Sequence, residues 1–212
     1  MTVTVSPAFL FDTDRGEAVD AELWDGITEA QLADWEGEWM PELFKAMQRL
    51  RRAGVDRQHW PQSRHWDWRK KAQVMQGLLA TPGFSVMCGG VTQGMMFVER
   101  AAHRCQLPEQ RGQHLVYVEF LENAPWNRKE VLFDPPRYRG VGSLLVRAAI
   151  ELSREEGFKG RLGLHSLPQA NEWYANSCGM TDLGIDPDKE GLRYFEMTTA
   201  LAEAFIAKGR LP

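Results

Sequence analysis

The most informative stretch of this 212-residue chain reads Arg137-Tyr138-Arg139-Gly140-Val141-Gly142-Ser143. Directly after it, apolar residues recur at helical spacing until Gly157, at Leu144, Leu145, Ala148, Ala149 and Leu152. Glycines before a helix let a ligand approach the backbone closely, and the unpaired amides of the first helical turn attract phosphate oxygens. The stretch therefore predicts a phosphate cradle at the start of a helix, where Arg137 and Arg139 add positive charge.

Other phosphate-binding loops share this logic, and the spacing of residues separates them. A P-loop requires Lys and then Ser or Thr after its last glycine, whereas Ser143 and Leu144 follow Gly142. A dinucleotide-binding fingerprint requires a third small residue three positions after its second glycine, where this chain has Leu145. Neither of these two loops fits. The alternative to a phosphate cradle of any kind is that the two glycines only turn the chain and cap a helix.

Strand and helix patterns alternate on both sides of the cradle. Residues 114–122 carry the strongest strand signal, with Tyr117, Glu119 and Leu121 on one face. The other expected elements are a hairpin over 84–88 and 95–100, a strand over 161–165, a helix over 168–178, paired strands over 180–185 and 192–197, and a helix after Thr199. This order indicates an α/β fold in which helices cover a mixed sheet.

The amino-terminal part is expected to hold a strand over residues 2–11 and then helices. Thr28 and Gln31 have the spacing of a capping box that opens a helix toward Trp39, and Pro41 suits the first turn of a second helix ending near Gly54. A third helix is expected over residues 69–79. Eleven acidic side chains and one basic side chain lie between positions 12 and 42, whereas positions 45–71 hold nine basic side chains and two acidic ones.

Composition excludes several classes of protein. No apolar run approaches the roughly 20 residues that span a bilayer, and the amino terminus lacks the pattern of a secretory signal, so we expect a cytoplasmic protein without membrane association. Cys88, Cys105 and Cys178 are widely spaced and odd in number, which fits neither a disulfide framework nor a metal site. The formal charge of −4 argues against a nucleic-acid partner.

The cradle resembles the signature Gln/Arg-x-x-Gly-x-Gly/Ala of the GNAT superfamily of N-acetyltransferases, here preceded by Pro135 and Pro136. Ala170-x-x-Trp173-Tyr174 resembles the Ala-x-x-Phe-Tyr helix of that family, and Cys178-Gly179-Met180 resembles the start of its next strand. The resemblance extends from Leu115 to Met197 and is weaker over residues 84–100. It implies one GNAT-like domain over residues 1–212, with a mostly antiparallel sheet and an elaborated helical amino-terminal part. Acceptor-side helices would lie within 1–80, the acetyl-CoA-binding core within 84–199, and a terminal helix within 200–212.

The resemblance also implies roles for individual residues. Tyr174 matches the family's general acid, which protonates the coenzyme thiolate, and the nearest equivalents of its carboxylate base are Glu119 and Glu122. Acetyl-CoA, the cosubstrate, would contact Leu121 and the cradle residues Arg137, Tyr138, Arg139, Gly140, Val141, Gly142 and Ser143. No metal is implied.

Three departures from the family pattern leave alternatives open. One residue more than usual separates Tyr174 from Gly179, so the helix must bulge or the phenol is displaced and only packs in the core. Residues 123–134 lengthen the connection before the cradle, so either Leu121 and Glu122 or Leu132 and Phe133 approach the pantetheine arm. The family's asparagine ahead of the tyrosine helix is replaced by Leu167.

Two other side chains near the expected site have simpler interpretations. His165 titrates near neutrality, but a hydrogen-bonded structural histidine is favoured over a catalytic one. Cys178 has no partner base in the sequence pattern and is favoured as an apolar filler over a covalent nucleophile.

We therefore expect an N-acetyltransferase that moves an acetyl group directly from acetyl-CoA to a primary amine of a small molecule, peptide or protein in a ternary complex. Asp34, Glu36, Glu38 and Glu42 suit a cationic acceptor, or else form a solvated helix face whose tryptophans belong to the core. The rival functions are a non-catalytic acyl-CoA-binding module and, with Trp60, Trp66 and Trp68 as stacking platforms, an RNA-associated acetyltransferase. A homodimer is a further expected assembly.

Overall fold

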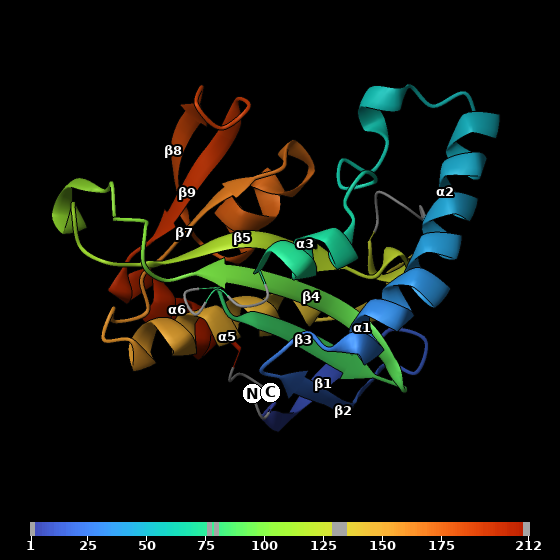
Figure 1. Ribbon diagram of the computed structural model, residues 1–212, viewed down its shortest axis with the longest axis horizontal. Helices are drawn as coiled ribbons and strands as arrows, with labels where there is room; N and C mark the ends of the chain where they lie inside the picture. The colour runs from blue at the N-terminus through green and yellow to red at the C-terminus, as the bar shows by residue number, and fades with distance from the viewer. Residues whose placement is uncertain (1–2, 76–77, 79–80, 129–134, 210–212) are drawn as a thin grey trace. The chain divides into compact units, whose positions relative to one another are not determined.

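A computed structural model describes residues 3–75, 78, 81–128 and 135–209 of the protein. Its nine strands form one sheet with the order β6-β1-β2-β3-β4-β5-β7-β9-β8. The strands are β1 Val5–Asp12, β2 Glu17–Trp24, β3 Gly83–Cys88, β4 Val91–Glu99, β5 Val116–Asn123, β6 Tyr138–Arg139, β7 Leu162–Ser166, β8 Thr181–Asp186 and β9 Leu192–Met197. The helices are α1 Glu29–Asp34, α2 Met40–Arg52, α3 Trp68–Met75, α5 Val141–Glu155 and α6 Thr199–Lys208 (Figure 1).

The sheet is mixed, as expected. Strands β5 and β7 pair in parallel, with Val116 opposite Leu162, and helix α5 provides the connection between them. The pairs β1–β2, β1–β6, β2–β3, β7–β9 and β8–β9 are antiparallel. The α/β class with a mostly antiparallel sheet flanked by helices is therefore confirmed.

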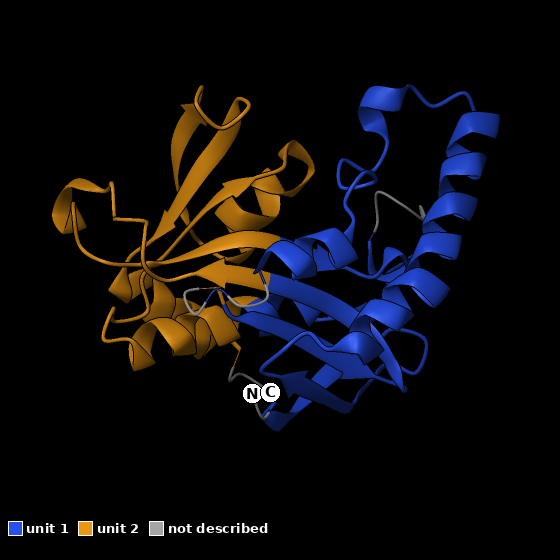
Figure 2. Cartoon of the chain, viewed as in Figure 1, with its two compact units in different colours: residues 1–78, 82–96, 121–145 blue, residues 79–81, 97–120, 146–212 orange. Residues whose placement is uncertain are grey.

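The chain divides into two compact units, and three elements pass from one to the other (Figure 2). Unit 1 holds residues 1–78, 82–96 and 121–145, and unit 2 holds residues 79–81, 97–120 and 146–212. Strands β4 and β5 and helix α5 each contribute residues to both units. The single domain over residues 1–212 stays a prediction.

Strand β2 was not expected, because its acidic residues were assigned to a connecting stretch. Its outward positions include Asp20 and Glu22, whereas Ala21 between them is buried, so this part of the strand alternates as a half-buried strand does. The turn before it is held by Asp12, whose Oδ1 accepts hydrogen bonds from the amides of Asp14 and Arg15. The acidic composition is therefore the reason that the β1–β2 hairpin was not predicted from the sequence.

The two short helices expected after Thr28 form one continuous helix (Figure 1). The capping box is confirmed, because Thr28 Oγ1 accepts from the Ala30 amide and Gln31 Oε1 accepts from the Thr28 amide at 2.8 Å. A π-helical turn over Trp35–Trp39 joins α1 to α2 and ends just before Pro41. Proline crowds the carbonyl four residues before it, and this wider turn covers that position, so the helix continues through the proline.

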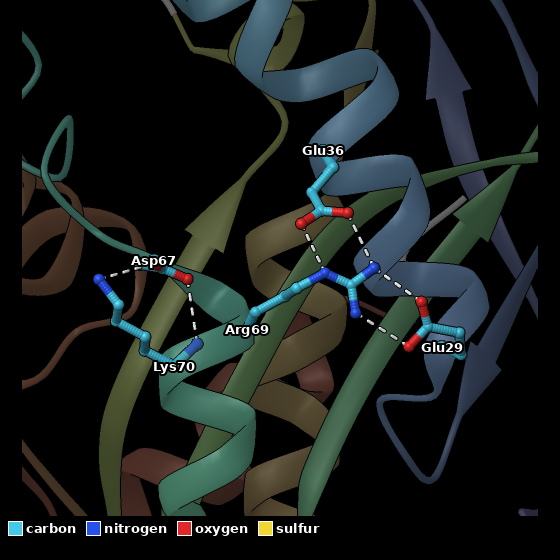
Figure 3. A network of polar contacts seen from close by, with 5 residues as sticks. All are labelled: Glu29, Glu36, Asp67, Arg69 and Lys70. Carbon is cyan, nitrogen blue, oxygen red and sulfur yellow. Dashed lines mark hydrogen bonds and ion pairs between the residues drawn. The ribbon is translucent and has the colours of Figure 1, made fainter.

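Charged side chains connect α3 to this helix within unit 1. Arg69 of α3 donates hydrogen bonds to the carboxylates of Glu29 and Glu36, and Asp67 Oδ1 accepts from the Lys70 amide at the start of α3 (Figure 3). The bonds to Glu29 and Glu36 raise the pKa of Arg69, and the bond from Arg69 lowers the pKa of Glu29. Because both carboxylates are solvent-exposed, the network orients α3 more than it stabilises the fold.

In unit 2, a buried carboxylate anchors the connection between β4 and β5. Glu196 of β9 is fully buried and accepts hydrogen bonds from the amides of Gln106 and Leu107 and from Gln110 Nε2. These donors satisfy a charge that would otherwise be costly to bury. The last strand therefore fixes a loop that lies about ninety residues earlier in the chain.

The first turn of α5 packs tightly against β4 at Gly94. A Cβ atom at position 94 would lie 2.6 Å from Val141 Cγ1 and 3.1 Å from Leu145 Cδ1. Both distances are shorter than normal carbon contacts, so only glycine lets the helix approach the strand this closely.

Gly94→Ala is expected to lower the free energy of unfolding by about 1–3 kcal/mol, because the new methyl group overpacks the contact with Val141. Gly37→Ala is the matched control, because nothing lies within 4 Å of the added Cβ. The control is expected to stabilise the protein by about 0.5–1 kcal/mol, since alanine is the better helix former. Urea unfolding measures both, and equal effects of the two substitutions would contradict the packing argument.

Candidate functional site

The predicted phosphate cradle lies in unit 1, at the start of α5. Gly140 immediately precedes the helix and has φ +100°, a conformation that favours glycine. Helical hydrogen bonding begins at the Leu144 amide, which donates to the Gly140 carbonyl at 2.8 Å. By helix geometry the amides of residues 141–143 have no acceptor within the helix. Of these three residues, Ser143 is exposed. The prediction that a helix starts directly after Gly140 is therefore confirmed, and the phosphate cradle itself stays a prediction.

The segment before the cradle is held as a short edge strand. Strand β6 pairs with β1, where Tyr138 lies opposite Asp12. Thr13 adds two bonds, because its amide donates to the Arg137 carbonyl at 3.0 Å and its hydroxyl donates to the Pro136 carbonyl at 2.5 Å. Arg137 and Arg139 are exposed, whereas Tyr138 is buried. The two guanidinium groups are therefore available to an anion, and the Tyr138 side chain packs in unit 1.

Two further residues, Gln93 and Asn127, position the cradle, and neither was predicted from the sequence. Asn127 Oδ1 accepts from the Tyr138 amide at 2.9 Å, and Asn127 Nδ2 donates to Gln93 Oε1 at 2.9 Å. Gln93 Nε2 donates in turn to the carbonyls of Cys88 and Val91 at the β3–β4 turn. The described part of the long connection is therefore tied to β4 through Gln93. The sequence signal that could have identified Asn127 is its place after Pro125-Trp126, where it ends a 3₁₀ turn over Pro125–Asn127.

Glu122, one of the two candidate bases, is buried in a set of donors. Its carboxylate accepts from Ser63 Oγ at 2.5 Å, from Trp68 Nε1 at 2.6 Å and from Arg128 Nη1 at 2.8 Å. Arg128 and Glu122 form an ion pair whose side chains are 9% and 7% exposed. This arrangement joins α3 and the long connection to the end of β5.

Glu119, the other candidate base, lies in unit 2 and is half-buried on β5. Its Oε1 atom is 3.8 Å from His103 Nε2. Leu121 follows two residues later and is half-buried in unit 1, so its side chain keeps accessible apolar surface. The alternative contacts Leu132 and Phe133 lie outside the described residues.

Tyr174 lies in unit 2 on a π-helical turn over Trp173–Ser177. The Cys178 amide donates to the Trp173 carbonyl five residues earlier, which is the bulge that the extra residue before Gly179 predicted. The Tyr174 ring packs against Trp173 and Phe195 and is 6% exposed. Burial raises the pKa of Tyr174 well above 10, so its hydroxyl keeps the proton at neutral pH.

Comparison with solved structures identifies the fold. The GNAT domain of S. lividans PAT is 17% identical, with a TM-score of 0.54 over 90% of this chain and 96% of that chain. Putative arylalkylamine N-acetyltransferase 7 from Aedes aegypti is 11% identical, with a TM-score of 0.51 over 92% and 94%. The chain has the GNAT fold. Mycobacterium smegmatis RimJ, solved in complex with CoA-disulfide, is 12% identical with a TM-score of 0.50 over 98% and 95%.

The fold is recognisable although the sequence has diverged. No family model matches the chain, and no curated protein matches its sequence. What the chain shares with this fold is a mostly antiparallel sheet flanked by helices. Among the described residues, no helix is long and apolar enough to cross a membrane, and no group of His, Cys, Asp and Glu is arranged to hold a metal ion.

The acidic side chains of the amino-terminal helix are largely engaged within the protein. Asp34 accepts from the amide and hydroxyl of Thr92, Glu36 binds Arg69, and Glu42 binds Lys45. Trp35 and Trp39 are 7% and 2% exposed and belong to the core. This matches the alternative in which the helix presents a solvated acidic face over core tryptophans.

The aromatic residues of the basic segment are also partly engaged. Trp68 is fully buried against Glu122, so it offers no face to a nucleic-acid base. Trp60 is half-buried and donates from Nε1 to the Val55 carbonyl. Lys71 lies over the Trp66 ring, with Nζ 4.6 Å from its centroid.

Cys178 is a buried thiol at the end of the tyrosine turn. Burial raises the pKa of Cys178 to about 12, so the thiolate that a covalent route requires is scarce at neutral pH. The two other cysteines, Cys88 and Cys105, are also buried and free. Cys178 therefore acts as apolar filler in unit 2.

Glu122→Ala is expected to lower the free energy of unfolding by about 3–5 kcal/mol, because Ser63, Trp68 and Arg128 lose the buried carboxylate that accepts their hydrogen bonds. Glu119→Ala is the matched control on the same strand, and its half-exposed side chain should change stability by only about 0.5 kcal/mol. Urea unfolding measures both variants. Similar small losses in the two would show that the Glu122 cluster does not stabilise the protein.

Proposed function

We propose that this protein is an N-acetyltransferase that transfers an acetyl group from acetyl-CoA to a primary amine. The observation that carries the proposal is the first turn of α5, which follows the left-handed Gly140, exposes Ser143 and comes directly after the exposed Arg139. Amides at a helix start, the helix dipole and nearby guanidinium groups are the features that bind a pyrophosphate. The GNAT fold supports this proposal, since proteins of known structure with this fold include one described as a putative arylalkylamine N-acetyltransferase.

The cradle residues fit a coenzyme of this kind. Positions 140–143 offer main-chain amides, and Arg137 and Arg139 offer charge. Leu121 offers apolar surface for the pantetheine arm. Bound acetyl-CoA would supply an activated thioester, and no metal takes part in the proposed reaction. A neighbour with this fold, RimJ, was solved with CoA-disulfide, which supports the choice of donor.

We assign the reacting groups to unit 2. Tyr174 holds a proton at neutral pH and is proposed to deliver it to the leaving thiolate. Glu119 is proposed to meet the acceptor amine, because its half-buried carboxylate attracts a cation, whereas three donors already occupy Glu122. Direct transfer is favoured over a covalent intermediate because the Cys178 thiol seldom ionises.

The acceptor is proposed to be a primary amine of a small molecule, a peptide or a protein. The buried free cysteines suit a reducing compartment, so we place the reaction in the cytoplasm. The specific observation that favours a non-catalytic acyl-CoA-binding module instead is the burial of Tyr174. Release of coenzyme thiol separates the two functions.

Ser143→Asp is expected to weaken coenzyme A binding at least about tenfold without loss of stability. An acidic side chain in the first turn of a helix favours the helix dipole, but it repels the pyrophosphate. Ser143→Ala is the control, because it keeps the backbone amides and adds no charge. Titration calorimetry with coenzyme A and a thermal melt give the two readouts. Unchanged affinity in Ser143→Asp would rule out the cradle as the pyrophosphate site.

Tyr174→Phe is expected to reduce kcat by about 10²-fold while coenzyme A affinity is retained, because only the proton donor is lost. Glu119→Gln is expected to raise KM for cationic amines and to lower kcat, because the attracting charge is removed. Thiol released from acetyl-CoA over a panel of small amines and peptides measures both. Coenzyme A binding without thiol release from the wild-type protein would favour the non-catalytic module.

A further inference from the structure

A continuous hydrogen-bond chain crosses three strands of unit 2. Tyr117 of β5 bonds through its hydroxyl to His165 Nδ1 of β7 at 2.7 Å. His165 Nε2 in turn lies 3.0 Å from Asp186 Oδ2 at the end of β8. The proposed roles of Tyr174 and Glu119 use none of these side chains.

The direction of the bonds follows from the chemistry of the three groups. The Asp188 amide and His165 lower the pKa of Asp186, so its carboxylate is ionised at neutral pH and can only accept. His165 Nε2 must then carry the proton, and Nδ1 of the neutral ring accepts from the Tyr117 hydroxyl. The Tyr117 oxygen therefore keeps lone pairs for an incoming N–H group.

The hydrogen-bond chain from Tyr117 to Asp186 runs from the interior of unit 2 to its surface. Tyr117 is 4% exposed, and the side chains of His165 and Asp186 are 7% and 28% exposed. The His103 ring stacks on the Tyr117 ring with centroids 3.8 Å apart, which shields the phenol from one side. Glu119 lies two residues beyond Tyr117 on the same face of β5 and close to His103.

Other charged and titratable side chains lie near this hydrogen-bond chain. Lys189 Nζ lies 5.9 Å from the Tyr117 ring centroid, and the Tyr194 ring of β9 lies 4.9 Å from His165. Tyr194 donates to Glu196, which also accepts from the β4–β5 connection. Burial lowers the pKa of His165, whereas Asp186 raises it, and burial prevails. The imidazole is therefore neutral at pH 7 and available as a base.

We propose that Tyr117, His165 and Asp186 form a proton relay that deprotonates the acceptor amine, with Glu119 holding the ammonium group beside Tyr117. The inference rests on the proposed function and names the destination of the amine proton. As the amine N–H bond breaks, a new O–H bond forms on Tyr117, and the original hydroxyl proton moves to His165 Nδ1. Asp186 stabilises the resulting imidazolium, which returns one proton to water at the exposed end of the relay.

The relay suits the proton transfer better than a carboxylate alone. A general base is most effective when its pKa lies near the operating pH, and imidazole is the side chain that ordinarily titrates nearest to it. Burial raises the pKa of the Tyr117 phenol, so Tyr117 passes a proton without ever existing as a stable phenolate. Tyr117 would be the catalytic residue, and His165 and Asp186 would act through it.

The test measures thiol release from acetyl-CoA, with a reactive amine, as a function of pH. Tyr117→Phe and His165→Gln are each expected to lower kcat by about 10²-fold, and the double variant should fall no further because the two act as one unit. Wild-type kcat/KM should decline as the pH falls through the His165 pKa, below about 6.5. That decline should vanish in His165→Gln.

Asp186→Asn gives a readout that a merely structural role would not move. Losing the carboxylate removes the group that raises the His165 pKa, so the acidic decline should shift to lower pH. Tyr194→Phe is the matched control, because Tyr194 packs beside His165 outside the relay and should leave the pH profile unchanged. Nitrogen NMR of the His165 ring should show protonated Nε2 and unprotonated Nδ1, and coenzyme A affinity should be retained in every variant.

The outcomes separate the relay from the proposed function. Wild-type turnover with unchanged kcat and pH profile in His165→Gln would overturn the relay and leave the acetyltransferase proposal standing. A ring protonated on Nδ1 instead of Nε2 would also overturn the relay. Coenzyme A binding without thiol release for any amine would overturn both.

Discussion

The close contact between Gly94 and the first turn of α5 is the constraint on which the candidate coenzyme site depends. Without a side chain at position 94, Val141 and Leu145 rest directly on β4, and the helix starts at a fixed point in unit 1. Gly140 then turns the chain in the left-handed region, which sets the amides of residues 141–143 at the helix start. A larger residue in β4 would displace these amides together with the helix.

The cradle also depends on contacts far away in the sequence. Gln93, one residue before Gly94, reaches Asn127, and Asn127 fixes the Tyr138 amide. Adjacent positions on β4 therefore control both the helix that follows the cradle and the segment that precedes it. The connection over residues 123–134 is longer than the family pattern has it. Its residue Asn127 is joined to the sheet in unit 1 through Gln93.

Local patterns were sufficient to predict the parts of the fold that are determined locally. The capping box at Thr28 and the bulge after Tyr174 both follow from spacing along the chain, and β9 has the expected bounds. Strand β2 was missed because cross-strand pairing with β1, not its own acidic composition, determines its conformation. The engagement of Glu122 could not be predicted either, since Ser63 and Trp68 reach it from more than fifty positions away.

Glu196 illustrates how a late residue completes an early loop. The connection at Gln106–Gln110 leaves the ribosome well before β9 does, and its amides meet their acceptor only when Glu196 follows. Until then the loop has water as its partner, and β7 lacks its neighbour strand β9 as well. Unit 2 therefore closes only after β9 has been synthesised, which makes the pairing of this strand the step that commits the unit to its native form.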